Sequence, residues 1–214
     1  MEPTERNRRA WDEIHRLRAE ATTGGIPDPI RERLHVAGKH VLHLQCGSGE
    51  STAELLELGA LVTAVDPSEE AIEAARARAP DVVFLHADVH ELPLELHRGR
   101  FDLVYTGGGV LRSVHDLDVW AAGIASALKP GGTLLLYDDH PVAACIDHLA
   151  HWRADYFADE PDDRRWRLGQ VVTAIADAAL VVRSLEEFVS LYRWRDHDRR
   201  VPGQFLLLAE KPHE

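Results

Sequence analysis

A short glycine-containing segment, HLQCGSGEST at residues 43–52, is the part of the sequence with the clearest potential for binding a ligand. An apolar run enters it, and a helical pattern with free N–H groups at its first turn follows it. Gly47 and Gly49 allow the backbone to approach a ligand closely or to adopt the positive φ that a tight turn requires. This pattern predicts a strand, a turn and a helix that together bind a polar ligand.

Two acidic residues follow the next two apolar runs. Asp66 closes the run 61–66 and lies 19 residues after Gly47, close to the spacing of about 20 that is typical of an acid binding ribose hydroxyls. Asp88 follows the run 82–87. A dinucleotide fingerprint would require a third small residue where Thr52 stands. The spacing therefore favours a nucleoside-containing ligand over a dinucleotide.

Short apolar runs alternate with helical patterns from residue 39 onward, which is typical of βαβ units and a parallel sheet. Gly, Pro or Asp bounds most of these runs. We predict strands at 40–45, 61–66, 82–87, 101–106 and 132–138, and helices at 50–59, 68–79, 115–128 and 168–179. Two later runs, beginning at Leu180 and at Gln204, predict a strand pair. The expected fold is α/β, a Rossmann-like doubly wound sheet of about seven strands, mostly parallel with an antiparallel edge strand.

The length of 214 residues suits a single domain. Within 1–214 we expect an N-terminal helical cap (1–38, with a helix at 4–21), a cofactor-binding core (39–138), a substrate-side insertion (139–167) and a C-terminal helix with a strand pair (168–214). The insertion contains several aromatic residues. We interpret them as side chains that pack in the core, in preference to side chains that line a substrate pocket.

The charge and the cysteine usage exclude several classes of function. The formal net charge is −12, without a basic cluster to offset it, which argues against nucleic acid as a partner. No apolar run is long enough to span a membrane, and the N-terminus lacks an apolar signal core. Cys46 and Cys145 form no CxxC pair. We therefore expect a cytoplasmic protein whose partner is a small molecule; the sequence specifies no oligomeric state.

Residues 40–142 resemble the motifs of class I S-adenosylmethionine-dependent methyltransferases, from VLHLQCGSGES through TAVDPS and HADVHELP to LKPGGTLLLYDDHPV. The sequence HLQC and the later HPV resemble motifs of a subgroup of these enzymes that methylates small molecules. The resemblance implies S-adenosylmethionine as the cofactor. Departures from the common pattern are His43, where an acid usually stands, and Gln45, where the first glycine stands. The positions that the resemblance assigns to the cofactor are Gln45, Cys46, Gly47 and Gly49 for the methionine part, Asp66 and Pro67 for the ribose, and Asp88 and Val89 for the adenine.

The implied reaction is methyl transfer to an unidentified small molecule by in-line displacement, for which positioning can supply much of the catalysis. Where the acceptor must lose a proton, candidate bases at the carboxyl ends of strands are His140 first, then Tyr105 and His115. Each of these also has a structural interpretation, as a core or hydrogen-bonded side chain. Residues 138–140 could bind a divalent metal, but successive strand residues alternate faces, and we predict no metal.

Two alternative functions stay open at this point. One is a non-catalytic module that binds S-adenosylmethionine. The other, less favoured, is an NAD(P)-dependent oxidoreductase, which the missing third glycine and the lack of a Tyr-x-x-x-Lys pair disfavour. The glycines at 107–109 occupy the place where many amine and nucleic-acid methyltransferases carry an Asn/Asp-Pro-Pro-aromatic motif, which argues against base methylation.

Overall fold

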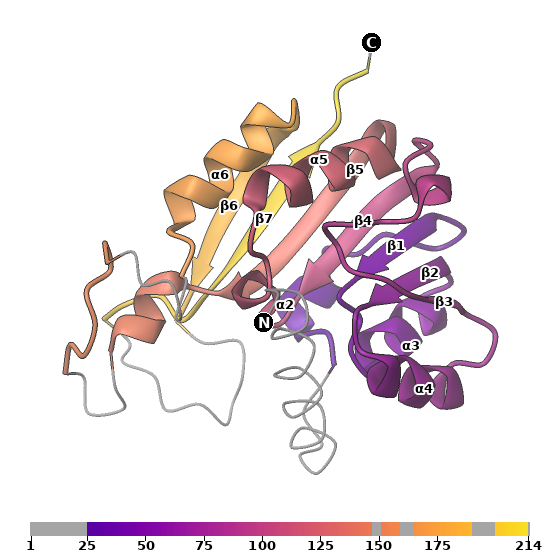
Figure 1. Ribbon diagram of the computed structural model, residues 1–214, viewed down its shortest axis with the longest axis horizontal. Coiled ribbons are helices and arrows are strands. Elements are labelled where there is room, and N and C mark those ends of the chain that lie inside the picture. The colour runs from indigo at the N-terminus through magenta and orange to yellow at the C-terminus, as the bar shows by residue number, and fades with distance from the viewer. Residues whose placement is uncertain (1–24, 147–150, 159–164, 190–199, 214) are drawn as a thin grey trace.

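The described residues form one seven-stranded sheet in the order β3-β2-β1-β4-β5-β7-β6. The computed structural model describes residues 25–146, 151–158, 165–189 and 200–213. All strand pairs are parallel except those of β7, which runs antiparallel between β5 and β6 (Figure 1). This topology confirms the predicted Rossmann-like sheet. The strands are β1 (His40–Leu44), β2 (Leu61–Asp66), β3 (Val83–His86), β4 (Phe101–Gly107), β5 (Leu128–Asp139), β6 (Val181–Phe188) and β7 (Gln204–Glu210).

The four helices predicted within the described residues lie where the sequence pattern places them, each two or three residues shorter in total, and the structure adds a short helix, α2. Ser68 begins α4 by accepting a hydrogen bond from Ala71 N, and Asp116 begins α5 in the same way. The predicted helix at 4–21 falls outside the described residues. The α-helices are α2 (Asp28–Arg31), α3 (Glu50–Glu57), α4 (Glu69–Arg78), α5 (Leu117–Ala127) and α6 (Leu168–Asp177), and the 3₁₀ turns are η1 (Leu94–Leu96), η2 (Val110–Arg112) and η3 (Pro141–Cys145).

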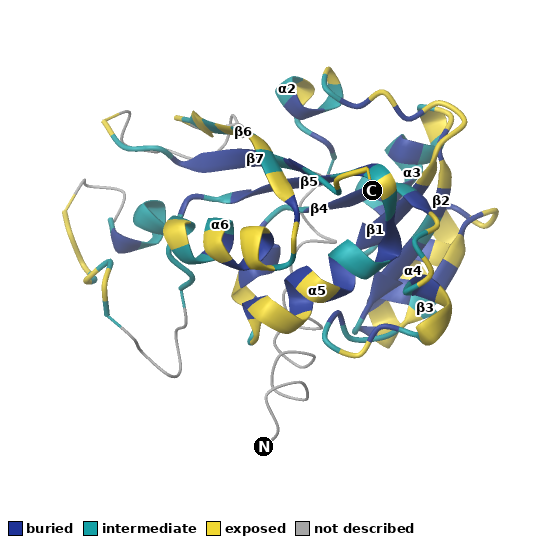
Figure 2. Ribbon diagram, turned by 90° about the horizontal axis from the view of Figure 1, so that it is seen from above, coloured by how far each residue is buried: buried dark blue, intermediate teal, exposed yellow. Residues whose placement is uncertain are grey.

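Two hydrophobic cores cover the two faces of the sheet. One packs α5 and α6 against the strands, and the other packs α2, α3 and α4 against the opposite face. In Figure 2, α5 and α6 lie on one side of the sheet and α2 on the other. Residues 41–44 of β1 are all buried because both of its faces are covered, as is typical of a central parallel strand. In β6, at the edge, exposed and half-buried residues alternate.

The fifth strand begins earlier than the sequence predicts. We expected the Lys-Pro-Gly-Gly turn to separate helix from strand and to start the strand at 132. In the structure α5 ends at Ala127 and β5 begins at Leu128, which pairs with Phe101. Gly131 has φ +76°, and its N–H donates to Lys211 O. The turn therefore forms an irregular first part of β5, because β4 and the chain after β7 provide hydrogen-bond partners for it.

The predicted insertion, residues 139–167, is described in part. It starts with η3 after β5 and continues to an isolated bridge between Ile146 and Trp152. Trp152 and Phe157 are exposed, whereas Trp166 packs against the core that contains α5 and α6. Among the described helices, none combines the length and apolar character needed to cross a membrane.

Candidate functional site

The turn after β1 lies at the point where the strand order reverses, between β1 and β4. In open α/β sheets the crevice at the carboxyl ends of such strands is where ligands bind. The N–H of Gly47 donates to Asp66 Oδ2 (2.8 Å), and the N–H of Ser68 donates to Asp66 Oδ1 (2.9 Å). The turn and the acid that closes β2 are thus held together, as their spacing predicts. Carboxylate oxygens can each accept more than one hydrogen bond, so the chemistry of Asp66 suits a ligand hydroxyl.

The two glycines of the turn have different structural demands. Both adopt positive φ, +54° at Gly47 and +83° at Gly49. A Cβ built on Gly49 would lie 2.8 Å from the Cβ of Ala75 in α4. Gly49 is therefore required by its backbone conformation and by the close packing of α3 on α4. Its contribution to a ligand site is the placement of the first turn of α3.

Gln45 adopts φ +55°, a left-handed conformation that is uncommon for residues other than glycine. Its amide crosses to the far side of the crevice, where Nε2 donates to Val110 O (3.0 Å) and to Ser113 Oγ (2.6 Å). Its Oε1 accepts from Thr106 Oγ1 (3.3 Å). The side chain that replaces the common glycine therefore ties the end of β1 to the segment after β4.

His43, which stands where an acid is common, is buried and neutral. Its Nδ1 is 2.8 Å from Thr52 Oγ1, and its ring meets the edge of Tyr105. Burial lowers the pKa of His43 to about 3. A neutral imidazole beneath the turn packs α3 onto β1, and it offers no charge to an ammonium group.

Pro67 lies directly after the last residue of β2, and Cys46 follows the last residue of β1 by two positions. The Cys46 thiol is buried, and burial, followed by the nearby charge of Asp66, raises its pKa well above the ordinary value. Pro67 follows Asp66, and its carbonyl lies 2.9 Å from His86 Nε2. Both residues border the crevice, and neither brings a reactive side chain to it.

Asp88 lies after β3 with a half-buried carboxylate. Its Oδ1 accepts from the backbone N–H of His90 (2.9 Å) and contacts His90 Nδ1 (2.6 Å). Burial raises the pKa of Asp88, but the His90 hydrogen bonds and the nearby imidazoles outweigh burial, and the net pKa is lowered. Val89 is buried in the core, so only its backbone can face a ligand. Asp88 is thus an ionised acceptor beside the crevice.

A small cavity lies further along the same edge, at the end of β5. Asp138 lines it from β5 and His140 from the position directly after the strand, and η2, η3 and residues 165–166 close it. The Nδ1 of His140 accepts from Val142 N (3.2 Å), and its Nε2 lies 3.1 Å from Glu187 Oε1. The ring therefore borders the cavity while capping η3. The lining residues are Leu111, Arg112, Asp138, Asp139, His140, Pro141, Ala144, Arg165 and Trp166.

The other two candidate bases lie elsewhere. Tyr105 is fully buried within β4, and its ring packs near His43 and Tyr137. The ring of His115 packs against that of His90 in a tilted arrangement, with ring centroids 3.6 Å apart. Of the three, His140 alone lines the described cavity. Tyr105 is directed into the core because its position on the strand faces the layer of α3 and α4.

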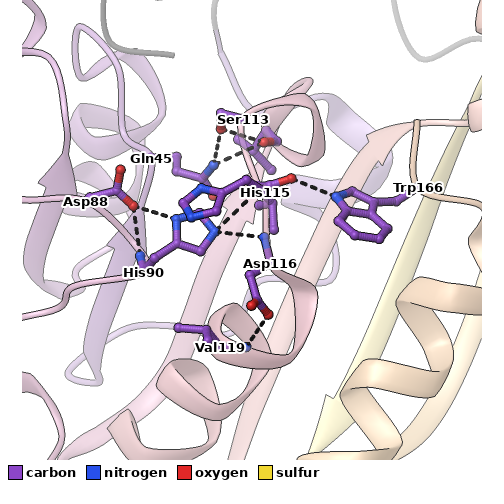
Figure 3. Close-up of polar contacts among 10 residues, drawn as sticks. Gln45, Asp88, His90, Ser113, His115, Asp116, Val119 and Trp166 are labelled. Atoms are coloured by element: carbon purple, nitrogen blue, oxygen red, sulfur yellow. Dashed lines mark hydrogen bonds and ion pairs between the residues drawn. The ribbon is translucent and has the colours of Figure 1, made fainter. Parts of the chain in front are cut away.

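The segment between β4 and α5, residues 108–116, is held from several sides (Figure 3). Besides Gln45, the N–H of Leu111 donates to Asp138 Oδ2 (2.8 Å), and the indole N–H of Trp166 donates to Val114 O (2.7 Å). The sequence did not predict this role for Asp138 or Trp166, and it did not single out His90. The nearness of His90 to Asp88 in sequence was the one available signal.

The sheet order, the turn after β1 and the acids after β2 and β3 define the class I methyltransferase architecture. The profile of the methyltransferase domain family matches residues 41–132. Residues 41–132 are therefore similar to a methyltransferase domain, in agreement with the motifs, and S-adenosylmethionine is the cofactor that this similarity implies. The narrower HLQC subgroup stays a prediction.

Known proteins similar to this chain agree with that assignment. An uncharacterized methyltransferase of Synechocystis is 34% identical over 113 residues, covering 52% of each protein. A ubiquinone biosynthesis O-methyltransferase of Xanthomonas euvesicatoria is 36% identical over 111 residues, 50% of this chain and 46% of that protein. The chain spans about half the length of these curated relatives. A solved S-adenosylmethionine-dependent methyltransferase from Mesorhizobium loti superposes with a TM-score of 0.70 at 25% identity, covering 84% of this chain and 94% of that one.

Proposed function

We propose that this protein transfers a methyl group from S-adenosylmethionine to a small-molecule acceptor. The observation that carries the proposal is the hydrogen bond of 2.8 Å between Gly47 N and Asp66 Oδ2. It fixes the turn after β1 against the acid after β2, at the crevice where the sheet order reverses.

The donor and acceptor groups of the crevice fit an adenosyl cofactor. Asp66 presents carboxylate oxygens suited to ribose hydroxyls. At Asp88 both hydrogen bonds use Oδ1, and no described residue donates to Oδ2. That oxygen suits the amino group of adenine, which has hydrogen-bond donors to offer. S-Adenosylmethionine, when bound, supplies a methyl group on a positively charged sulfur.

The acceptor is assigned to the cavity at the end of β5. This cavity lies at the same carboxyl edge of the sheet, and Asp138, His140 and Trp166 line it. Both ring nitrogens of His140 are engaged, one by η3 and one by Glu187. The proposal therefore rests on holding the acceptor against the methyl group and excluding water, which can supply a large part of the rate. The assistance of His140 as a base remains an additional proposal.

The test starts with calorimetric titration of S-adenosylmethionine into the wild-type protein and into Asp66→Asn. We expect the substitution to weaken binding by tenfold or more, since hydrogen bonds to a charged group contribute roughly 1.5–3 kcal/mol. The exposed Asp81→Asn serves as a matched control that leaves binding unchanged. Thermal denaturation verifies that Asp66→Asn is folded, because it also alters the partner of Gly47 N.

Binding alone does not distinguish an enzyme from a binding module. Formation of S-adenosylhomocysteine is therefore measured with a panel of phenols, carboxylic acids, amines and thiols. Acceptor-dependent product confirms transfer. A folded wild-type protein that binds no S-adenosylmethionine, or a folded Asp66→Asn that binds it as tightly as the wild type, would contradict the proposed function.

A further inference from the structure

His90 connects Asp88 to the segment that precedes α5. Its side chain is buried, at 6% exposure, and its Nδ1 lies 2.6 Å from Asp88 Oδ1. On the other side of the ring, Nε2 accepts from the backbone N–H groups of His115 (3.2 Å) and Asp116 (3.4 Å). Figure 3 shows the imidazole between these two sets of partners.

The two sets of partners fix the protonation pattern of the ring. Because two N–H groups point at Nε2, this nitrogen must present its lone pair to them. The proton of the neutral ring is therefore on Nδ1, and it is donated to Asp88. The ring of His115 lies against that of His90, with 3.6 Å between the centroids and an angle of 37° between the ring planes.

The same contacts orient the Asp88 carboxylate. Oδ1 is occupied by two donors from His90, its backbone N–H and its Nδ1. Oδ2 is then directed by the position of Oδ1, and no described residue donates to it. Asp116, whose N–H contacts Nε2, caps α5 through Asp118 N and Val119 N at 3.0 Å. The imidazole of His90 thus fixes the position of the Asp88 carboxylate relative to the start of α5.

We propose that His90 is a positioning residue that sets the selectivity of the cofactor crevice for a purine with an amino group at position 6. The inference rests on the proposed function and goes beyond it, because it names the residue that orients the acid. A fixed carboxylate oxygen accepts from an amino group and repels a carbonyl oxygen at the same place. Without the imidazole, Asp88 retains only the backbone bond and can rotate, so this discrimination decreases.

The experiment compares the binding of S-adenosylhomocysteine and S-inosylhomocysteine, which differ at position 6 of the purine. Wild-type protein is expected to prefer the adenosyl compound. His90→Gln, whose amide oxygen can still reach the two backbone N–H groups but whose donor to Asp88 is lost, lowers the ratio of the two affinities by about tenfold. His90→Asn places an amide N–H at the position of Nδ1, and it retains most of the ratio.

Two further variants calibrate the ratio. Asp88→Asn removes the negative charge and adds a donor, so it lowers the ratio at least as far as His90→Gln. His97→Asn alters a half-buried histidine whose ring nitrogens contact Ser126 and Leu92, neither of which is assigned to the cofactor. It changes stability and leaves the ratio at the wild-type value. Thermal denaturation of each variant separates loss of folding from loss of selectivity.

The outcomes separate the two proposals. A folded His90→Gln with the wild-type ratio, or one that loses affinity for both compounds equally, overturns the role of His90 and leaves the proposed function intact. Rescue of the ratio in His90→Asn supports the role. A folded wild-type protein that binds neither compound overturns the proposed function, and the positioning role with it.

Discussion

The buried Asp138 carboxyl at the end of β5 makes the stability of this protein depend on pH. It is 2% exposed, and it accepts hydrogen bonds from Leu111 N (2.8 Å) and Asp139 N (2.6 Å). Burial, with a further contribution from the Asp139 charge, raises the pKa of Asp138 to about 7 despite these bonds. The Asp138→Asn substitution removes this ionisable group, so comparing it with the wild type reveals the pH dependence of stability that Asp138 causes.

The sign follows from the protons that each state binds. Between pH 3.8, the ordinary pKa, and about 7, the unfolded chain ionises this carboxyl while the folded protein keeps its proton. Because the folded state then binds more protons, the free energy of unfolding decreases as pH rises through this window and levels off above it. At about 1.4 kcal/mol per pKa unit, the contribution of Asp138 to that decrease is on the order of 4 kcal/mol.

The assay is urea denaturation of the wild type and of Asp138→Asn at intervals from pH 4 to pH 8. The Asn side chain lowers the free energy of unfolding by about 1–3 kcal/mol at every pH, because one carbonyl oxygen replaces two acceptors for backbone N–H groups. Its stability relative to the wild type should therefore rise steadily from pH 4 to pH 7. The exposed Asp81→Asn is the control and should give a flat difference. A flat or falling difference for Asp138→Asn would refute the reasoning.

Two other substitutions test the turn after β1, each by thermal and urea denaturation. Gly49→Ala should lower the free energy of unfolding by about 2–4 kcal/mol, since it combines positive φ with a Cβ 2.8 Å from that of Ala75. Gly169→Ala, with no atom within 4 Å of the new Cβ, should be neutral or more stable by up to about 1 kcal/mol; equal effects of the two would contradict the packing argument. Gln45→Gly should destabilise by about 1–2 kcal/mol although it relieves a left-handed residue, because it forfeits the amide bonds to Ser113 and to the neighbouring groups. A more stable Gln45→Gly would show that the backbone strain outweighs them.

Local patterns in the sequence were sufficient to predict the sheet, and they indicated the acids that we propose for cofactor binding. Strands and helices repeat with different periods, and turn residues mark their boundaries, so the elements could be placed within a few residues. Parallel strands separated by helices bring their carboxyl ends to one edge, which places Gly47, Asp66 and Asp88 together. These inferences need only the order of elements along the chain.

The tertiary structure decided which side chains meet across that edge. Gln45 contacts Val110, 65 residues away, and Asp138 contacts Leu111, 27 residues away. Such pairs depend on strand order and register, and one residue of shift directs a strand side chain to the opposite face. For that reason Tyr105 lies in the core although the sequence allowed it a place in the crevice. His90, which the sequence did not single out, lies between Asp88 and the start of α5.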